Sequence, residues 1–441
     1  MKVLIVSHNA ISETSNMGKT LRACFRDFAC EEIAQFYIHS EAPSDASVCR
    51  NYYRFTDVDA IKSLLPFQTY GTIFEEPDIR TERTAVPTDA ALLRSVYQYG
   101  RRRTAAVYAL RNALWKRSRW DRPQLWKWVE DFGPDVVFFA SGDYGFLYDI
   151  ARQIAEHAGK PLAVACMDDF YLYNRNEGRL LGRIVHRSFL KTVHKTMAYA
   201  SAVFTICPSM QKEYEALFGK QCCVLPTPAE QWESPESSER SGVAYLGNLG
   251  LQRNRQLAAI GRTLRGMDAP GLPKFVDVYS GERNPEILKV LTEENGIRFH
   301  GAVSAEEVRQ ILQRSAAVIH TESFDSEIRK RIRFSISTKI PETLMNGPCL
   351  IAYGPEGAAS IDYVKENGAA YTITQPQQLE QGLREILTDA ALRNRIVGRA
   401  RALAKANHSM QANSANLRKS LAEICGQTAK TSSGPGGKWE Q

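Results

Sequence analysis

Short apolar runs alternate with helical stretches along almost the whole chain, and this alternation limits the possible folds more than any other feature. The runs are rich in valine, isoleucine, leucine and alanine, as expected for strands buried on both faces of a parallel sheet. In the first half they are residues 3–6, 136–140, 162–166 and 203–206, with less regular ones near 34–38 and 52–55. In the second half they are residues 243–246, 275–279, 297–299, 318–320, 349–352 and 370–373. The pattern predicts an α/β chain of the doubly wound type.

A polar, proline-interrupted segment divides the chain. It reads Thr-Pro-Ala-Glu-Gln-Trp-Glu-Ser-Pro-Glu-Ser-Ser-Glu from residue 227 onward, a composition typical of linkers. The glycine- and serine-rich C-terminus lacks the apolar residues that a packed segment needs. The predicted organisation is an N-terminal domain at 1–227, a linker at 228–241, a C-terminal domain at 242–406, a helix at 407–426 and a disordered tail at 427–441.

The composition is that of a large soluble enzyme. At 441 residues and 44% hydrophobic content the chain can build two or three full cores. No apolar run approaches the length of a membrane span, and the four apolar residues after Lys2 are too few for a signal peptide. The nine cysteines include no Cys-x-x-Cys pair, and Cys166, Cys207 and Cys349 lie in apolar runs. Reduced, buried thiols in a cytoplasmic protein are therefore expected.

Residues 334–354 predict a capped helix followed by a buried strand. Ser337 or Thr338 can cap the helix, and Pro341 falls in its first turn, where a missing N–H matters least. Gly347 is expected to end the helix in the left-handed conformation.

The same helix start carries groups that suit a nucleotide. Free N–H groups, the hydroxyls of Ser337 and Thr338 and the ammonium of Lys339 favour a phosphate. The carboxylate of Glu342 can accept hydrogen bonds from the two hydroxyls of a ribose. The alternative is an ordinary helix–strand unit with good caps, and helix rules alone favour that alternative.

The motif Ser-Thr-Lys-Ile-x-Glu at 337–342, the short helix, the glycine–proline turn and the strand resemble the nucleotide-sugar site of GT-B glycosyltransferases. Further segments similar to that superfamily follow in its order: 202–228 at the end of the N-terminal domain, then 243–250, 297–303 with a helix capped by Ser304, and 316–320 in the C-terminal domain. The resemblance implies two Rossmann-like, doubly wound domains facing a cleft. It also implies a nucleoside-diphosphate sugar on the C-terminal domain and an acceptor on the N-terminal domain.

The loop Gly247-Asn248-Leu-Gly, followed by Arg253 and Arg255, supplies a second phosphate-side element. A nucleotide-sugar transferase must stabilise a departing diphosphate, and without a metal ion guanidinium groups and backbone amides have to supply the positive potential. One of these arginines resembles the basic residue of this loop in the family, which implies a catalytic role for Arg253. The alternative is a solvent-exposed helix start.

The chain departs from the family in one respect. Many retaining members carry two glutamates eight positions apart around this site, but Phe334 stands eight residues before Glu342. Glu322 or Glu327 could take the role in space, although neither has the spacing. The way in which the donor sugar is held and the stereochemical outcome therefore stay open.

Two carboxylates follow strands of the N-terminal domain. Asp168 comes directly after the run 162–166, and Asp143 follows the run 136–140. The carboxyl ends of parallel strands face the crevice where α/β proteins bind ligands, so either carboxylate could accept the proton of an acceptor hydroxyl or bind sugar hydroxyls. The alternative for each is a helix cap or a loop hydrogen bond.

Gly18 follows the first strand within Gly-Lys-Thr. A phosphate-binding P-loop would need a glycine at position 13, which is Glu13. In the resembling superfamily a glycine here lets the backbone approach the donor phosphate or the acceptor, so Gly18 is a candidate. The alternative is a glycine in a helix start preceded by the capping residues Ser15 and Asn16.

Asp57-Val-Asp59 has the spacing of the metal-binding carboxylates in the other large glycosyltransferase fold. It precedes the apolar segment 60–65, where an aspartate is most simply a helix cap. We therefore expect no metal, and no cofactor other than the nucleoside-diphosphate sugar that serves as donor substrate. The histidines are scattered and are interpreted as structural: His8, His194, His300 and His320, of which the last ends a strand.

A basic insert at 94–127 contains eight arginines and two lysines against one acid, Asp121, a net charge of +9 in a chain of +7. Val107, Leu110 and Leu114 share one helical face, and four tryptophans lie nearby: Trp115, Trp120, Trp126 and Trp128. A basic helix with aromatic edges suits an anionic membrane surface. The alternatives are a solvated face and an RNA-binding patch, but no nucleic-acid-binding module is recognisable and no nucleic-acid partner is expected.

These features predict a metal-independent hexosyltransferase that moves sugar from a nucleotide sugar to a saccharide or lipid-linked acceptor. The family and the basic helix suggest bacterial surface polysaccharide biosynthesis, in the cytoplasm or on the inner face of the membrane. The alternatives are a sugar-nucleotide epimerase of the same fold and a catalytically silent binding or scaffold protein, which Phe334 favours.

Overall fold

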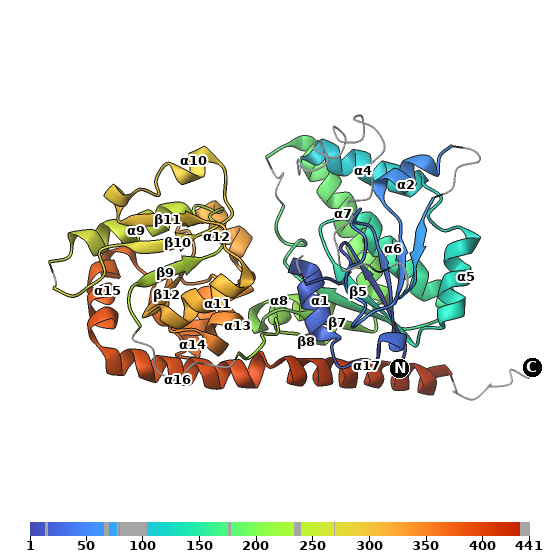
Figure 1. Cartoon of the computed structure of the whole chain (residues 1–441). Coiled ribbons are helices and arrows are strands. Elements are labelled where there is room, and N and C mark those ends of the chain that lie inside the picture. The colour runs from blue at the N-terminus through green and yellow to red at the C-terminus, as the bar shows by residue number, and fades with distance from the viewer. Residues whose placement is uncertain are drawn as a thin grey trace, which may run out of the picture. The chain divides into compact units, whose positions relative to one another are not determined.

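The computed structural model describes residues 1–13, 16–65, 70–76, 79, 104–174, 178–232, 240–268 and 270–432. The chain forms two compact units, one of Met1–Leu225 with Asn413–Gln441 and one of Pro226–Ala412. Strands and helices alternate through both units, as the sequence predicted (Figure 1). The expected basic residues 94–103, residues 233–239 of the expected linker and the end of the tail lie outside the described residues.

The first unit is built on an eight-stranded sheet in the order β4-β3-β2-β1-β5-β6-β7-β8. Its strands are β1 (Val3–Ser7), β2 (Ile33–Tyr37), β3 (Asn51–Arg54), β4 (Thr72–Phe74), β5 (Val136–Ser141), β6 (Leu162–Cys166), β7 (Ala202–Thr205) and β8 (Cys222–Val224). Neighbouring strands pair in parallel except β3 and β4, which are antiparallel. Val3 aligns with Ile33 of β2 on one side and with Val136 of β5 on the other, so β1 is an interior strand of the sheet.

Helices cover both faces of this sheet. They are α1 (Asn16–Cys24), α2 (Asp57–Lys62), α4 (Ala105–Arg117), α5 (Pro123–Phe132), α6 (Gly145–Ala158), α7 (Leu180–Tyr199), α8 (Pro208–Phe218) and α17 (Met410–Ser432). On one face Phe138 packs with Phe25, which directly follows α1, and with Leu421 of α17. On the other face the next residue, Phe139, meets Tyr148 of α6 edge to face at 4.8 Å. Alternating strand residues thus serve two separate cores.

The last helix, α17, belongs to the first unit from Asn413 onward. Leu417 and Leu421 are buried in the core beside Phe25, and Arg418 pairs with Glu32. The helix continues to Ser432, beyond the predicted end at 426. The prediction that disorder begins at 427 is therefore wrong, because no glycine or proline interrupts residues 427–432.

The second unit is built on a six-stranded sheet in the order β11-β10-β9-β12-β13-β14. Its strands, all paired in parallel, are β9 (Val243–Leu246), β10 (Val276–Tyr279), β11 (Ile297–Gly301), β12 (Ala317–Thr321), β13 (Cys349–Tyr353) and β14 (Tyr371–Ile373). Its helices are α9 (Arg253–Gly266), α10 (Pro285–Leu288), α11 (Ala305–Arg314), α12 (Ser326–Ile332), α13 (Lys339–Asn346), α14 (Ala359–Glu366), α15 (Leu379–Thr388) and α16 (Ala390–Asn407). Ile319 packs with residues of α9 and α15, whereas its neighbour Val318 packs with residues of α11, α13, α14 and α16.

The tryptophans near the basic helix belong to the core of the first unit. Trp115 is buried, and its Nε1–H donates a hydrogen bond to Asp57 at 2.6 Å. Trp128 is buried and donates to the side chain of Asn51 at 2.6 Å. Leu110, predicted to share an apolar face, is exposed instead. The aromatic edge expected at a membrane is therefore wrong for these residues, because the indole N–H groups have partners inside the fold.

All nine cysteines are free, in agreement with the reduced thiols that the sequence predicted. No helix within the described ranges is long and apolar enough to cross a membrane.

Candidate functional site

The second sheet has a topological switch point between β9 and β12. From β9 the chain adds β10 and β11 on one side and then returns to add β12 and β13 on the other. In open α/β sheets ligands bind outside the carboxyl ends of strands at such a point. The predicted loop at 247–253 follows β9, and Glu322 follows β12, so both lie at this edge of the sheet.

The loop after β9 is held in an unusual backbone conformation. Tyr245 donates its hydroxyl proton to the carbonyl of Asn248, and the Asn248 side chain accepts the N–H of Gly250, both at 2.6 Å. Leu251 and Gln252 then adopt left-handed φ angles of 59° and 60°. This conformation is energetically unfavourable for residues other than glycine. Two such residues in succession therefore indicate that surrounding contacts hold the backbone in place. The loop delivers the N-terminus of α9, with its partial positive charge, to the switch point.

Arg253, the first residue of α9, is locked to Glu322 of the neighbouring strand end. Its Nη2 donates to both carboxylate oxygens of Glu322, at 2.8 and 3.0 Å, and its Nε donates to Oε2 at 3.2 Å. Glu322 is only 2% exposed. Burial acts to lower the pKa of Arg253, but the adjacent Glu322 carboxylate raises it above the ordinary arginine value. The guanidinium of Arg253 therefore stays charged and is held in place by its hydrogen bonds to Glu322.

His320, in β12, precedes Glu322 by two residues and lies close to the same carboxylate. Its Nε2 is 3.0 Å from the hydroxyl of Ser360 and 3.4 Å from Glu322 Oε1. Burial lowers the pKa of His320 to about 4, with Glu322 opposing the shift and Arg253 reinforcing it. The imidazole is therefore neutral at physiological pH.

Of the two glutamates considered as replacements for the one absent at Phe334, the structure brings only Glu322 to the switch point. Glu327 lies on α12, is exposed and pairs with Lys330 at 2.7 Å. Phe334 itself is buried in the fold.

The start of α13 carries the predicted nucleotide-binding groups. Lys339 and Glu342 form an ion pair at 3.0 Å, with both side chains partly exposed. Thr338 occupies the cap position in a helical conformation and makes no side-chain cap, whereas the Ser337 hydroxyl accepts the N–H of Lys339 at 3.4 Å. Of the two predicted caps, the structure therefore favours Ser337.

Gly347 does end α13, but the predicted left-handed conformation is wrong. Its φ is −86°. A Cβ at this position would lie 2.6 Å from the carbonyl oxygen of Thr343. Close approach of the helix backbone, rather than a positive φ, requires the glycine.

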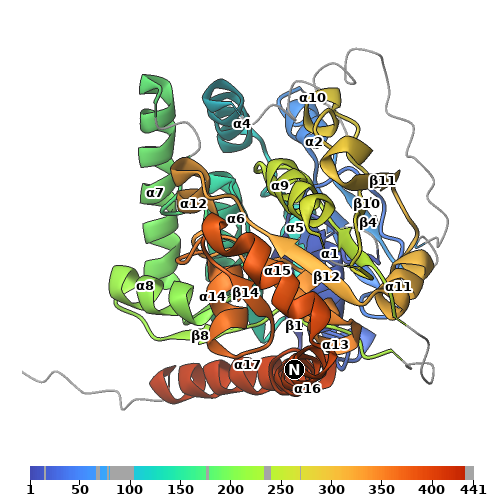
Figure 2. The same ribbon diagram turned by 90° about the vertical axis from the view of Figure 1, so that its left-hand side faces the viewer.

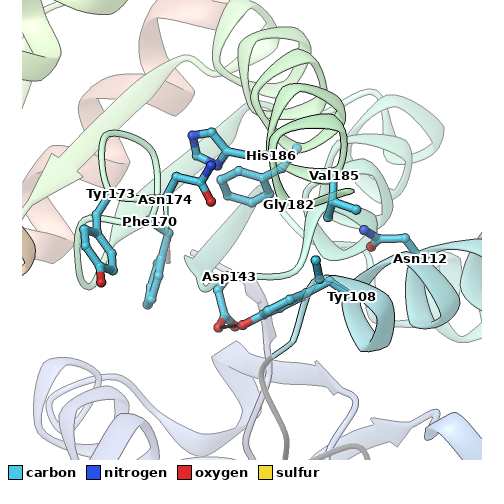
Figure 3. A pocket seen from close by; sticks show the side chains of 11 residues that line it. Tyr108, Asn112, Asp143, Phe170, Tyr173, Asn174, Gly182, Val185 and His186 are labelled. Atoms are coloured by element: carbon cyan, nitrogen blue, oxygen red, sulfur yellow. Dashed lines mark hydrogen bonds between the residues drawn. The ribbon is translucent and has the colours of Figure 1, made fainter. Parts of the chain in front are cut away.

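The first sheet has its own switch point, between β1 and β5. Asp143 follows β5 there and accepts a hydrogen bond from the Tyr108 hydroxyl of α4 at 2.5 Å. The two residues lie in a pocket whose wall also includes Phe170 and residues of α7 such as Val185 and His186 (Figure 3). Asp143, predicted to accept a proton from a sugar hydroxyl or to bind sugar hydroxyls, thus lies in a pocket within the first unit.

His8 is a candidate that the sequence analysis interpreted as structural. It directly follows β1 at the same switch point and stacks on Tyr144 with ring centroids 5.4 Å apart. Its Nδ1 is 3.0 Å from Asn9 Oδ1, which favours the tautomer whose Nε2 carries the lone pair. Burial lowers the pKa of His8 to about 4, so the ring is neutral at physiological pH. The signal in the sequence was its position at the end of the first strand.

Asp168 lies at the end of β6 but is not part of the pocket wall. Its Oδ1 accepts the N–H of Asp169 at 2.9 Å. Asp169, which the sequence did not single out, is buried and accepts the backbone N–H groups of Tyr171 and Leu172 and the hydroxyl of Tyr214. Asp169 organises the loop.

Gly18 is buried in the first turn of α1, the helix that follows β1. The role expected of Gly18 stays a prediction, and the preceding residues 14 and 15 lie outside the described ranges.

The Asp57–Asp59 pair is structural, as the capping interpretation implied, although the cap itself is Thr56. Thr56 and Asp59 form a reciprocal capping box at the start of α2. Asp57 pairs with Arg111 of α4 at 2.9 Å. Within the described residues no group of three or more histidines, cysteines or acids is placed to hold a metal ion.

Comparisons with known proteins agree with this architecture. Residues 262–419 match a family model described as glycosyl transferase-like. HepE from Anabaena, solved with UDP, superposes with a TM-score of 0.61 at 11% identity, covering 96% of this chain and 100% of HepE. The chain has the GT-B fold. Sucrose-phosphate synthase from Thermosynechococcus elongatus gives a TM-score of 0.57 at 9% identity, covering 97% of this chain and 100% of that enzyme.

A third GT-B relative in structure is the trehalose 6-phosphate synthase of Burkholderia multivorans, with a TM-score of 0.57, 12% identity and 99% of each chain covered. A search of curated protein sequences finds no match. The glycosyl transferase-like match includes Glu322 and the start of α13, whereas the loop at 247–253 precedes it. That loop is therefore assigned to the site by the GT-B topology and its own geometry.

Proposed function

We propose that the chain is a glycosyltransferase that moves a sugar from a nucleoside-diphosphate sugar to a saccharide or lipid-linked acceptor. The observation that carries this proposal is the switch point of the second sheet, where a strained loop, a helix N-terminus and a partly buried arginine converge. Such an arrangement suits a diphosphate. HepE, which shares the fold, has been solved with UDP and with UDP-glucose, and this supports the choice of ligand.

On the donor side, the diphosphate would lie against Gly247, Asn248 and the N-terminus of α9. Arg253 would stabilise the charge that develops on the leaving phosphate, with Arg255 one step further along the exposed side of α9. Since these groups supply positive potential themselves, the proposed mechanism needs no metal ion.

The start of α13 would hold the nucleoside part of the donor. Ser337, Thr338 and Lys339 would contact a phosphate, and Glu342 would accept hydrogen bonds from the ribose hydroxyls. Glu342 already pairs with Lys339, so in the complex its carboxylate would contact both the lysine and the ribose.

On the acceptor side, a sugar hydroxyl would enter the pocket that contains Asp143, with Gly18 at the neighbouring helix start. Asp143 is favoured over Asp168 as the group that accepts its proton, since Asp143 lines the pocket. The neutral imidazole of His8 is a second acceptor for that proton at the same strand edge. We place the acceptor among bacterial surface-polysaccharide intermediates on the strength of the family resemblance.

One observation favours a second function, that of a binding protein without transfer activity. Phe334 replaces the glutamate that many retaining members use for the donor sugar, and it is buried. A binding protein would retain nucleotide affinity but would not consume a nucleotide sugar, which distinguishes the two functions.

The donor site is tested by thermal unfolding with UDP, GDP, ADP, CMP and dTDP. One nucleoside diphosphate should stabilise the chain, by about 2.7 kcal/mol at a hundredfold excess over its dissociation constant. Glu342→Ala should weaken that nucleotide's binding about tenfold or more, since a charge-assisted hydrogen bond is lost.

The matched control is Glu286→Ala, which breaks another glutamate–lysine pair of the second unit at the same spacing on an exposed helix. It should leave nucleotide binding unchanged. If no nucleotide raises the melting temperature, the assignment of the site is wrong.

A further inference from the structure

Helix α7 has two chemically different faces. One face packs on α4 and α6 and contributes Gly182, Val185 and His186 to the wall of the Asp143 pocket (Figure 3). The other face is exposed along the whole helix. Figure 2 shows α7 and α4 side by side in the first unit.

The exposed face carries an uncompensated row of positive charge. Cations recur at every fourth position: Arg179, Arg183, Arg187, Lys191 and Lys195, all of them exposed. No aspartate or glutamate occurs between residues 178 and 212. Within the part of the chain that the structure describes, none of these five side chains pairs with a carboxylate. A fourfold spacing keeps successive cations adjacent on the helix surface.

At its N-terminal end the helix also exposes apolar side chains beside these cations. Leu180, Leu181 and Ile184 are 68%, 44% and 55% exposed. Transfer of exposed leucine and isoleucine side chains from water to the acyl boundary of a bilayer is favourable, because it removes apolar surface from water. These residues flank Gly182 and Val185, so the apolar end lies at the same turns of α7 as the pocket.

We propose that this face of α7 docks the protein on an anionic membrane surface. The five cations would meet lipid headgroups while Leu180, Leu181 and Ile184 enter the acyl boundary. An RNA partner explains the cations but leaves three exposed aliphatic side chains without a role, since RNA is bound through stacking and phosphate contacts.

Membrane docking would also limit the class of acceptor substrate that the enzyme can use. The pocket is lined by the same turns of α7 that carry the apolar residues, so a saccharide whose lipid carrier stays in the membrane could reach Asp143. This part rests on the proposed function, whereas membrane docking does not.

Sedimentation of the full chain with vesicles tests the docking. Binding should be strong to phosphatidylcholine vesicles containing phosphatidylglycerol, weak to pure phosphatidylcholine, and reduced by salt. The triple variant R183Q/R187Q/K191Q should bind anionic vesicles about tenfold more weakly or worse, and L180S/I184S should lose the binding that survives at high salt.

The matched control removes three exposed cations from α16, R395Q/R399Q/K405Q, and should bind vesicles like the wild type. Equal binding to neutral vesicles, wild-type binding by both α7 variants, or binding to RNA in place of vesicles would each overturn the proposal. Thermal unfolding with the nucleoside diphosphate identified above is measured on every variant. An unchanged nucleotide response with no vesicle binding would reject the membrane surface alone and leave the proposed donor site standing.

Discussion

Arg253 and Glu322 form an ion pair to which we assign both a structural and a catalytic role. Both side chains are largely buried, and each satisfies the charge of the other across strands that are far apart in the sequence. Removing one partner leaves an uncompensated buried charge, which costs about 3–5 kcal/mol. A single substitution therefore mixes a loss of folding stability with any loss of transition-state stabilisation.

Arg253→Ala should accordingly lower the free energy of unfolding by about 3–5 kcal/mol and reduce donor turnover by roughly a hundredfold or more. The double variant Arg253→Met with Glu322→Gln removes both charges and should recover most of the stability without recovering turnover. Urea denaturation and steady-state kinetics measure the two effects. Wild-type turnover in the double variant would mean that the pair is purely structural.

His320 should make folding sensitive to acid. Its folded-state pKa of about 4 lies below the ordinary value of 6.5, so between these pH values the unfolded chain binds a proton that the folded chain does not. Stability is full above pH 6.5 and falls as the pH drops toward 4, by about 3 kcal/mol from this residue. His320→Gln should therefore lose less stability than wild type between pH 7 and pH 4.5, measured by urea denaturation. Parallel pH profiles for the two proteins would contradict the assignment.

At the residue scale, the sequence identified the side chains that are positioned by local rules. Gly247, Asn248 and Arg253 were predicted from the resemblance of their loop to the GT-B family, and the structure places them after the carboxyl end of β9. The pairing of Arg253 with Glu322 could not be predicted, because it joins residues 69 positions apart through the order of the strands. His8 was missed since an isolated histidine has no motif, although its place after β1 was visible.

At the element scale, α17 completes the core of the first unit. Leu417 and Leu421 pack with Phe25 and Phe138, and burial of such side chains outweighs the weak helix preference of a polar segment. The sequence predicted a helix here but not its partner, because packing against α1 depends on the return of the chain to the first unit.

Leu421→Ala should destabilise the first unit by about 2–5 kcal/mol, since the side chain is fully buried and its removal leaves a cavity. Asn416→Ala, on the exposed side of the same helix, is the control and should change stability little. Chemical denaturation followed by tryptophan fluorescence reports on this unit, whose core contains Trp115 and Trp128. Equal stability of the two variants would show that α17 is not part of the core.

The basic insert shows where element-level reasoning fails. Periodicity placed Val107, Leu110 and Leu114 on one helical face among solvated cations, but Arg111 of the same helix is held by Asp57 and stacks on Tyr144. Tertiary partners decided which face of α4 is buried, and neither partner is near in sequence. The exposed cations of α7 were not predicted as a surface, because they are spaced four residues apart and form no compact cluster in the sequence.

At the scale of the whole molecule, two sheets of the same plan carry different chemistry at their switch points. The first presents a neutral histidine and a carboxylate beside a pocket, and the second presents a strained loop with a partly buried arginine. The proton acceptor that we propose in one unit and the diphosphate site that we propose in the other are the two halves that glycosyl transfer requires.

The most direct test of this account is consumption of a nucleotide sugar in the presence of EDTA. The chain is incubated with UDP-glucose, GDP-mannose, ADP-glucose and dTDP-glucose, and release of the nucleoside diphosphate is followed with and without a lipid-linked saccharide. We predict slow release from one donor alone, faster release with acceptor, no effect of EDTA, and loss of release in the Arg253→Met, Glu322→Gln double variant. Binding of a nucleotide without consumption of any donor would contradict the transferase, and strict dependence on a divalent metal would contradict the role given to Arg253.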